Sequence, residues 1–208
     1  MEAVILTMSG KHENLCVAVY SEEQNRLYRL VSDSSGGAIP FSYFNSFSVM
    51  DIVQFKPIAF IQNGPQKENI QIDMNVGITK IGHCRYGISN IYQNLYGVRE
   101  NYGFIFGNSY STLKYVDRLR HSLEICKVSN LIIKKVKLSS GKETGKADFD
   151  CGGYHHENYS VTDFDHDIRK KIIDTWIIGD AYIVVSIPPE PYEGDGKYYK
   201  FISSIFEC

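Results

Sequence analysis

The sequence lacks the features that mark secreted, membrane-spanning or disulfide-stapled proteins. Its five cysteines are odd in number, scattered and without a CxxC pair, which argues against a disulfide framework or a zinc ribbon. No apolar run approaches the roughly 18 residues of a membrane span, and the N-terminal MEAVILTMSG has no basic region of a secretory signal. We therefore expect a cytoplasmic protein with reduced thiols and no membrane partner.

An excess of charge of one sign is also missing. The 22 basic and 24 acidic residues give a net charge of -2, so no global positive field attracts polyanions and a nucleic-acid partner would need a local patch. Hydrophobic residues make up 43%, which is enough for a folded core. Tryptophan occurs once, yet 15 tyrosines and 11 phenylalanines supply flat side chains that suit strands and, where exposed, binding surfaces.

Strand patterns dominate the first half of the chain. Apolar or alternating runs at residues 4–8, 15–20 and 26–32 are joined by short polar segments, which predicts a three-stranded meander. A run at 51–61 is interrupted by Pro57, which indicates a sheet edge or a bulge. The segment that follows, up to residue 107, has no clear period, and we interpret it as irregular structure that links two halves.

The second half combines predicted strands with two predicted helices. The stronger helix signal spans 162–176, where acidic residues crowd the first turn and isoleucines supply an apolar face. A second helix is predicted at 111–125, with an extended conformation as the alternative. The predicted strands are 131–138, two short strands within 147–161, 181–187 and 198–206. Two groups of strands, each the size of a five-stranded barrel, are compatible with two small β-barrels in tandem.

Short motifs along nearly the whole chain resemble those of a known family. They are ILTMSGK (5–11), CVAV (16–19), RLVS (29–32), GGAIP (36–40), DIV (51–53), QKEN (66–69), YSVTDFDHDIR (159–169), VVSI (184–187) and YYKFISSI (198–205). In this order and spacing they resemble the bacterial dual OB-containing domain family. The departures are Val19 and Pro188-Pro189 where the family has glycine, and Lys67 where it has proline, and these affect turns more than chemistry.

The resemblance implies a mostly β (α+β) fold of two tandem OB-like small β-barrels with one or two helices. We expect residues 1–100 to form the first barrel with an irregular connecting segment, and 101–208 to form the second, including a helix near 162–176. It also implies a nucleic-acid-binding role in bacterial defence or mobile-element contexts, which rests on analogy of fold because OB barrels bind other ligands too. A separate effector protein chain is an expected partner.

Stacking aromatics and a basic groove are what an OB barrel needs to hold single-stranded DNA or RNA. The predicted nucleic-acid-binding residues are Lys11, Arg26, Tyr28, Arg29, Phe55, Lys56, Lys135 and Lys137. The last two share one face of a strand because side chains alternate. The alternative is that Tyr28 and Phe55 belong to the core and that the charges are ordinary surface.

Charge is strongly divided along the second half. Residues 114–146 carry a net charge of +6, from nine basic and three acidic residues, and residues 147–195 carry -8, from three basic and eleven acidic ones. The acidic segment predicts either salt bridges to the basic one within the fold or a basic protein partner.

A metal site or a catalytic site has little support. Cys151, His155, His156, Asp163, Asp165 and His166 fall within sixteen residues, but the adjacent histidines point to opposite faces of a strand. No nucleophile elbow, P-loop or GxGxxG occurs. The sequence therefore predicts a non-catalytic module without cofactor or metal, which recognises single-stranded nucleic acid or a nucleotide-like ligand. A protein-interaction module using the acidic half is the alternative, and a metal-dependent hydrolase is a weaker one.

Overall fold

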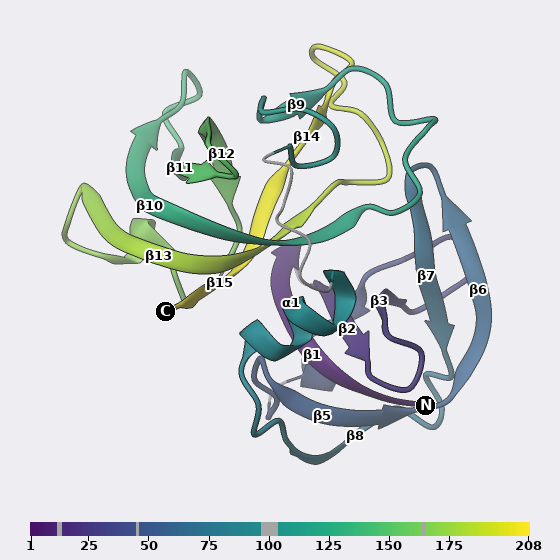
Figure 1. Ribbon diagram of the computed structural model, residues 1–208. Helices are drawn as coiled ribbons and strands as arrows, with labels where there is room; N and C mark the ends of the chain where they lie inside the picture. The colour runs from purple at the N-terminus through teal and green to yellow at the C-terminus, as the bar shows by residue number, and fades with distance from the viewer. Residues whose placement is uncertain (12–13, 45, 97–103, 164) are drawn as a thin grey trace.

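Two groups of strands, one from each half of the chain, make up the structure (Figure 1). The computed structural model describes residues 1–11, 14–44, 46–96, 104–163 and 165–208, without the side chain of Lys11. The predicted division between residues 100 and 101 falls outside the described residues and stays a prediction.

The first half forms a sheet in the order β6-β7-β3-β2-β1-β5-β8, with β4 paired to β2. The bounds are β1 (Glu2–Lys11), β2 (Asn14–Ser21), β3 (Arg26–Val31), β4 (Ile39–Pro40), a 3-10 turn η1 (Phe41–Phe44), β5 (Asp51–Phe55), β6 (Pro57–Asn63), β7 (Gln66–Ile72) and β8 (Ile78–His83). The predicted meander of β1, β2 and β3 is confirmed, because β2 pairs antiparallel with both β1 and β3.

Pro57 marks the point at which the first sheet turns back on itself. Only Lys56 separates β5, which pairs with β1, from β6, which pairs with β7. Because proline has no N–H to donate, it ends one ladder and lets the chain continue into the other. Together, β5 and β6 act as one split strand that links both ends of the path β7-β3-β2-β1 and so completes a five-stranded barrel. The expected interruption at Pro57 is confirmed. We call this sheet the first barrel.

The second half forms a closed barrel in the order β10-β11-β12-β15-β13, with β12 and β15 parallel. Its strands are β10 (Leu123–Lys137), β11 (Glu143–Cys151), β12 (Tyr154–Val161), β13 (Thr175–Ser186) and β15 (Phe201–Glu207), and the two-residue strands β9 (Thr112–Leu113) and β14 (Tyr198–Tyr199) pair beside it. The first barrel has the same order: β1, β2, β3 and β7 correspond to β10, β11, β12 and β15, and the split strand corresponds to β13. The parallel pair of the first barrel is β3 and β7. The predicted fold class, mostly β with two OB-like barrels, is confirmed.

Helix α1 (Ile88–Tyr96) and a shared apolar layer join the two barrels. We call this layer the inter-barrel core: Val4, Leu6, Ala18, Tyr20 and Leu27 from the first barrel, Ile88 and Ile91 from α1, and Leu123, Ile125, Tyr182 and Val184 from the second barrel. Each barrel has its own interior as well. No helix among the described residues is long and apolar enough to cross a membrane.

The predicted helix at 162–176 is wrong. Among the described residues of this range, the 3-10 turn η2 (Ile168–Lys170) is the only helical segment, and β13 begins at Thr175. The acidic side chains that suggest a helix start instead bind other groups: Asp163 accepts a hydrogen bond from the Ile205 N–H at 2.7 Å, and Asp167 caps η2. Such side-chain to backbone bonds compete with helix formation.

The other helix predictions also need correction. Residues 111–125 contain β9, an irregular segment and the start of β10 instead of a helix. The stretch interpreted as irregular holds β7, β8 and α1. Helix α1 is short and polar on one side, and its apolar residues Ile88, Ile91 and Leu95 recur at helical spacing.

Candidate nucleic-acid interface

The two aromatic residues predicted to stack on bases are core residues. Tyr28 in β3 and Phe55 in β5 are buried in the interior of the first barrel, because their positions in the alternation point inward. The hydroxyl of Tyr28 donates to the Gln24 side chain. The prediction that they offer stacking surfaces is wrong, and the alternative that they belong to the core is confirmed.

The predicted basic residues of the first barrel are dispersed. Arg26 is exposed and lies 5.7 Å from the centre of the Tyr28 ring, whereas Arg29 is buried. Lys56 is exposed and pairs with Asp73 at 2.9 Å, and its hydrogen bond lowers the pKa of that carboxyl. The backbone of Lys11 ends β1, but its side chain lies outside the described part of the chain.

Lys135 and Lys137 lie at the far end of β10, in the second barrel. The Lys135 ammonium donates to the Lys171 carbonyl at 3.0 Å. The structure therefore places the predicted residues on both barrels and does not bring them together in one surface.

The outer face of the first three strands, where OB barrels bind oligonucleotides, is largely occupied in the first barrel. The side chains that point outward from β1, β2 and β3 include Leu6, Tyr20 and Leu27, which belong to the inter-barrel core. An oligonucleotide cannot lie along this face while the second barrel and α1 cover it.

The equivalent face of the second barrel is open but locally acidic. Lys134 pairs with Asp148 at 2.7 Å, and His155 with Asp150 at 2.6 Å, while Glu157 lies beside them. The hydrogen bond to Asp150 raises the pKa of His155. Because these charges are already paired and acidic side chains are in excess, the face does not suit a phosphate backbone.

Exposed aromatic residues occur in the second barrel and in the segments beside it. We call them the aromatic surface, and its members are Phe104, Tyr110, Tyr115, Tyr154 and Tyr192. Tyr110 is 74% and Tyr115 73% exposed, and the rings of Phe104 and Tyr154 lie 4.4 Å apart. Tyr192 reaches the same end of the barrel, where its ring lies 5.9 Å from Tyr199 of β14, the partner strand of β9.

The segment that carries three of these rings is anchored to the barrel by a buried lysine. The Lys200 ammonium donates to the Asn108 carbonyl at 3.0 Å, to the Asn108 side chain at 2.8 Å and to the Ile105 carbonyl. Burial lowers the pKa of Lys200 to about 7. Leu113 and Val116 are buried in the second barrel, and β9 pairs with β14 above it (Figure 1). The exposed rings therefore project from a fixed backbone.

Three exposed cations lie in the same segment of the chain as Tyr110 and Tyr115. Lys114, Arg118 and Arg120 have no carboxylate oxygen of the described residues within 4.0 Å of their side-chain nitrogens. The Lys114 ammonium lies 5.4 Å from the centre of the Tyr115 ring. Stacking platforms next to free cations are what single-stranded nucleic acids bind without base readout.

Comparison with known proteins agrees with this architecture. The family model of the dual OB-containing domain matches residues 1–205 of the 208-residue chain. The chain belongs to the dual OB-containing domain family. No curated protein and no solved structure matches it.

In this dual OB chain the acidic segment is partly used within the fold. Besides the pairs of Asp148 and Asp150, Asp167 pairs with Arg169 at 2.6 Å. The His166 ring lies between Asp163 and Glu207, at 2.9 Å and 3.1 Å. Burial lowers the pKa of His166, but the two carboxylates outweigh it and the net pKa is raised. Internal pairing thus uses part of the charge behind the protein-interaction hypothesis, while Asp165, Asp174, Asp180, Glu190 and Glu193 form no ion pair with the described residues.

The residues behind the hydrolase hypothesis do not converge. His155 is exposed and His156 fully buried, so the two point to opposite faces as predicted. Within the described ranges, no three His, Cys, Asp or Glu side chains are grouped so that they could hold a metal ion.

The aromatic surface was not predicted, because Phe104 and Tyr192 fall in segments interpreted as irregular or turn, Tyr115 in a predicted helix and Tyr154 in a predicted strand. A signal was present: tyrosines and glycines recur without a period up to residue 115, and the basic segment begins at Lys114. Exposed tyrosines next to unpaired cations could have been selected on this basis, but their anchoring by Lys200 requires contacts distant in sequence.

Proposed function

We propose that this protein is a non-catalytic binding module that holds single-stranded nucleic acid on the aromatic surface of its second barrel. The observation that carries the proposal is that the second half of the chain combines five exposed rings with three cations that have no carboxylate partner among the described residues. Membership of the dual OB family supports a binding role. A cytoplasmic location and a separate effector chain in a bacterial defence context belong to this proposal as well.

Stacking supplies most of the affinity in this account. Each base on an aromatic side chain contributes roughly 1–3 kcal/mol, and any base can stack. The electrostatic part is small, because acidic residues of the neighbouring loop, Glu190, Glu193 and Asp195, offset the three cations. The module therefore binds short single strands with little sequence preference and with a modest dependence on salt.

Fluorescence anisotropy with short DNA and RNA oligonucleotides over a salt series tests the proposal. Three phosphate contacts to a single strand give a slope of about -2 for the logarithm of the association constant against that of the salt concentration. Arg118→Gln should make the slope about 0.7 less steep, since it removes one contact. No binding at about 50 mM salt, or a duplex bound as tightly as a single strand, refutes the proposal.

A further inference from the structure

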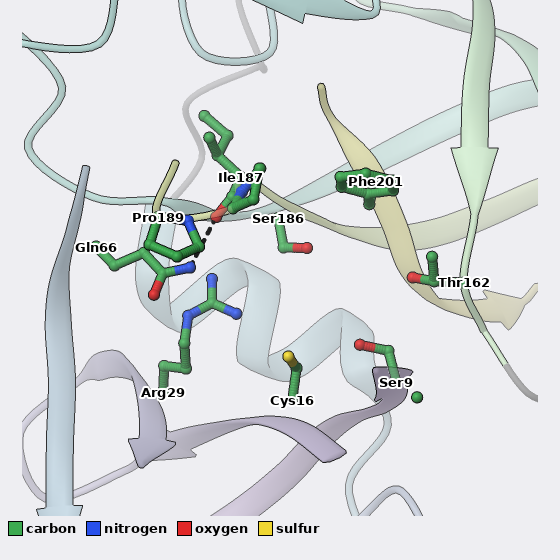
Figure 2. Close-up of a pocket in the computed structure, with 11 residues that line it drawn as sticks. Ser9, Cys16, Arg29, Gln66, Thr162, Ser186, Ile187, Pro189 and Phe201 are labelled. Carbon is green, nitrogen blue, oxygen red and sulfur yellow. Dashed lines mark hydrogen bonds between the residues drawn. The ribbon is translucent and has the colours of Figure 1, made fainter. Parts of the chain in front are cut away.

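A cavity of about 250 Å³ lies where the two barrels meet, and none of the five aromatic-surface residues lines it (Figure 2). The first barrel contributes Ser9, Cys16 and Arg29 from β1, β2 and β3, and the second contributes Ser186 and Phe201 from β13 and β15. The volume lies just below the roughly 300 Å³ at which small-molecule pockets begin. It suits a group the size of one nucleotide or less and excludes a run of bases.

The cavity occupies an open part of the face that OB barrels use for ligands. Cys16 and Arg29 point outward from β2 and β3, as do the apolar residues of the inter-barrel core further along the same strands. At this end the second barrel leaves a space instead of packing against the first. A hydrogen bond across the gap, from Gln66 Nε2 to the Ile187 carbonyl at 3.0 Å, holds the two walls together (Figure 2).

Arg29 is the unusual group in this cavity. Its side chain is 6% exposed and makes one hydrogen bond with the described residues, from Nη2 to Ser122 Oγ at 3.1 Å. Its Nε is buried without a partner, and no described carboxylate oxygen lies within 4.0 Å of the guanidinium. A buried cation with free donors is unfavourable unless an anion completes it.

Ser122 connects Arg29 to a buried carboxylate, that of Glu68, through hydrogen bonds. Glu68 Oε1 accepts hydrogen bonds from both the N–H and the hydroxyl of Ser122, while Glu68 Oε2 has no partner. This arrangement fixes the Arg29 guanidinium and offsets its charge, but it leaves the buried Nε of Arg29 without a partner among the described residues.

Two further donors line the same space. The hydroxyls of Ser9 and Ser186 form no hydrogen bond with any residue that the structure describes. The ring of Phe201 lies across the cavity from Arg29 (Figure 2). A tetrahedral phosphate accepts from several donors at once, and arginine is well suited to it. An aromatic wall is suited to a flat base.

We propose that this cavity binds a terminal phosphate group, with Arg29 as its cationic partner and Ser9 and Ser186 as hydroxyl donors. The group is that of a nucleoside 5′-monophosphate or the 5′-phosphate of a strand, whose base lies against Phe201. This site is separate from the aromatic surface, and neither proposal depends on the other.

Isothermal titration of the full chain with adenosine 5′-monophosphate, adenosine and inorganic phosphate tests the site. The monophosphate should bind, and adenosine should bind at least about 10-fold more weakly. Arg29→Gln should lower the affinity for the monophosphate by about 10-fold or more. Arg26→Gln is the matched control, since Arg26 is exposed on the same strand, and it should leave binding unchanged. If Arg29→Gln does not fold, Ser186→Ala replaces it, with a loss of about 3- to 10-fold.

The two sources of the phosphate are distinguished by oligonucleotides with and without a 5′-phosphate, on a variant in which Tyr110 and Tyr115 are alanine. If the 5′-phosphate raises the affinity of the oligonucleotide for this variant, and Arg29→Gln abolishes the increase, the site binds strand ends. A response to the mononucleotide alone assigns it to free nucleotides. No monophosphate binding at about 5 mM, or equal binding by the wild type and both cavity variants, overturns the proposal.

Discussion

The buried ammonium of Lys200 makes stability depend on pH in a way that a single substitution can reveal. Burial lowers the pKa of this side chain from 10.5 to about 7. Between these values the unfolded chain binds the proton and the folded chain releases it, so the free energy of unfolding rises with pH. The lysine therefore contributes least to stability at acidic pH.

The size of the effect follows from the shift. One pH unit corresponds to about 1.4 kcal/mol, so the Lys200 contribution should increase by about 2 kcal/mol between pH 7 and about pH 9. In Lys200→Met that increase disappears, because methionine does not titrate. The variant also leaves the carbonyls of Ile105 and Asn108 without their donor, which costs about 1–3 kcal/mol for each one that stays buried.

Urea unfolding at several pH values measures the difference in the free energy of unfolding between the wild type and Lys200→Met. Taking the difference removes the tyrosines and thiols that titrate in both proteins. Lys197→Met is the matched control, since Lys197 is exposed and its contact with water changes little on folding. A difference that stays flat from pH 7 to about pH 9 refutes the reasoning from burial.

Two further substitutions test the contacts that hold the fold together. A side chain at Gly64 would place its Cβ 2.3 Å from the Pro189 carbonyl oxygen, at a φ of +55°, so Gly64→Ala should lower the free energy of unfolding by at least about 2 kcal/mol in urea. A stability equal to the wild type would contradict this close contact between the barrels. The pKa of His166 is higher in the folded chain than in the unfolded chain. Its pairing with Asp163 and Glu207 therefore stabilises the fold fully at a pH below the unfolded-state pKa, and this stabilisation is lost as the pH rises through the folded-state pKa. His166→Gln should therefore destabilise more at about pH 5.5 than at about pH 8.5 in thermal unfolding, and an equal loss at both would count against the ion pairs.

Most strands could be predicted because the burial of alternate side chains is a local signal. The runs at 15–20 and 26–32 and the break at Pro57 appear in the structure almost as the pattern places them. The helix prediction at 162–176 was wrong because contacts distant in sequence decide the conformation there. Asp163 and His166 look like the start of a helix, yet they bind Ile205 and Glu207 of the last strand, about 40 positions away.

The candidate site was less predictable than the fold. In β3 the alternation of side chains was visible, but the sequence does not tell which face becomes the core, so Tyr28 was assigned to the surface and is buried. Arg29, from the same strand, was selected as a surface residue and lines a cavity that exists only because the second barrel packs there. The placement of one barrel on the other decides both outcomes, and no local pattern encodes it.

Comparing the affinities of Tyr115→Ala and Phe41→Ala for a short single strand shows whether the second barrel holds the nucleic-acid site. Both rings are exposed, but Phe41 lies on the first barrel, away from the aromatic surface. We expect Tyr115→Ala to weaken binding by about 5- to 150-fold, from the loss of about 1–3 kcal/mol of stacking, and Phe41→Ala to leave it unchanged. Equal affinities for the two variants, or no binding by the wild type, would contradict a nucleic-acid site on the second barrel.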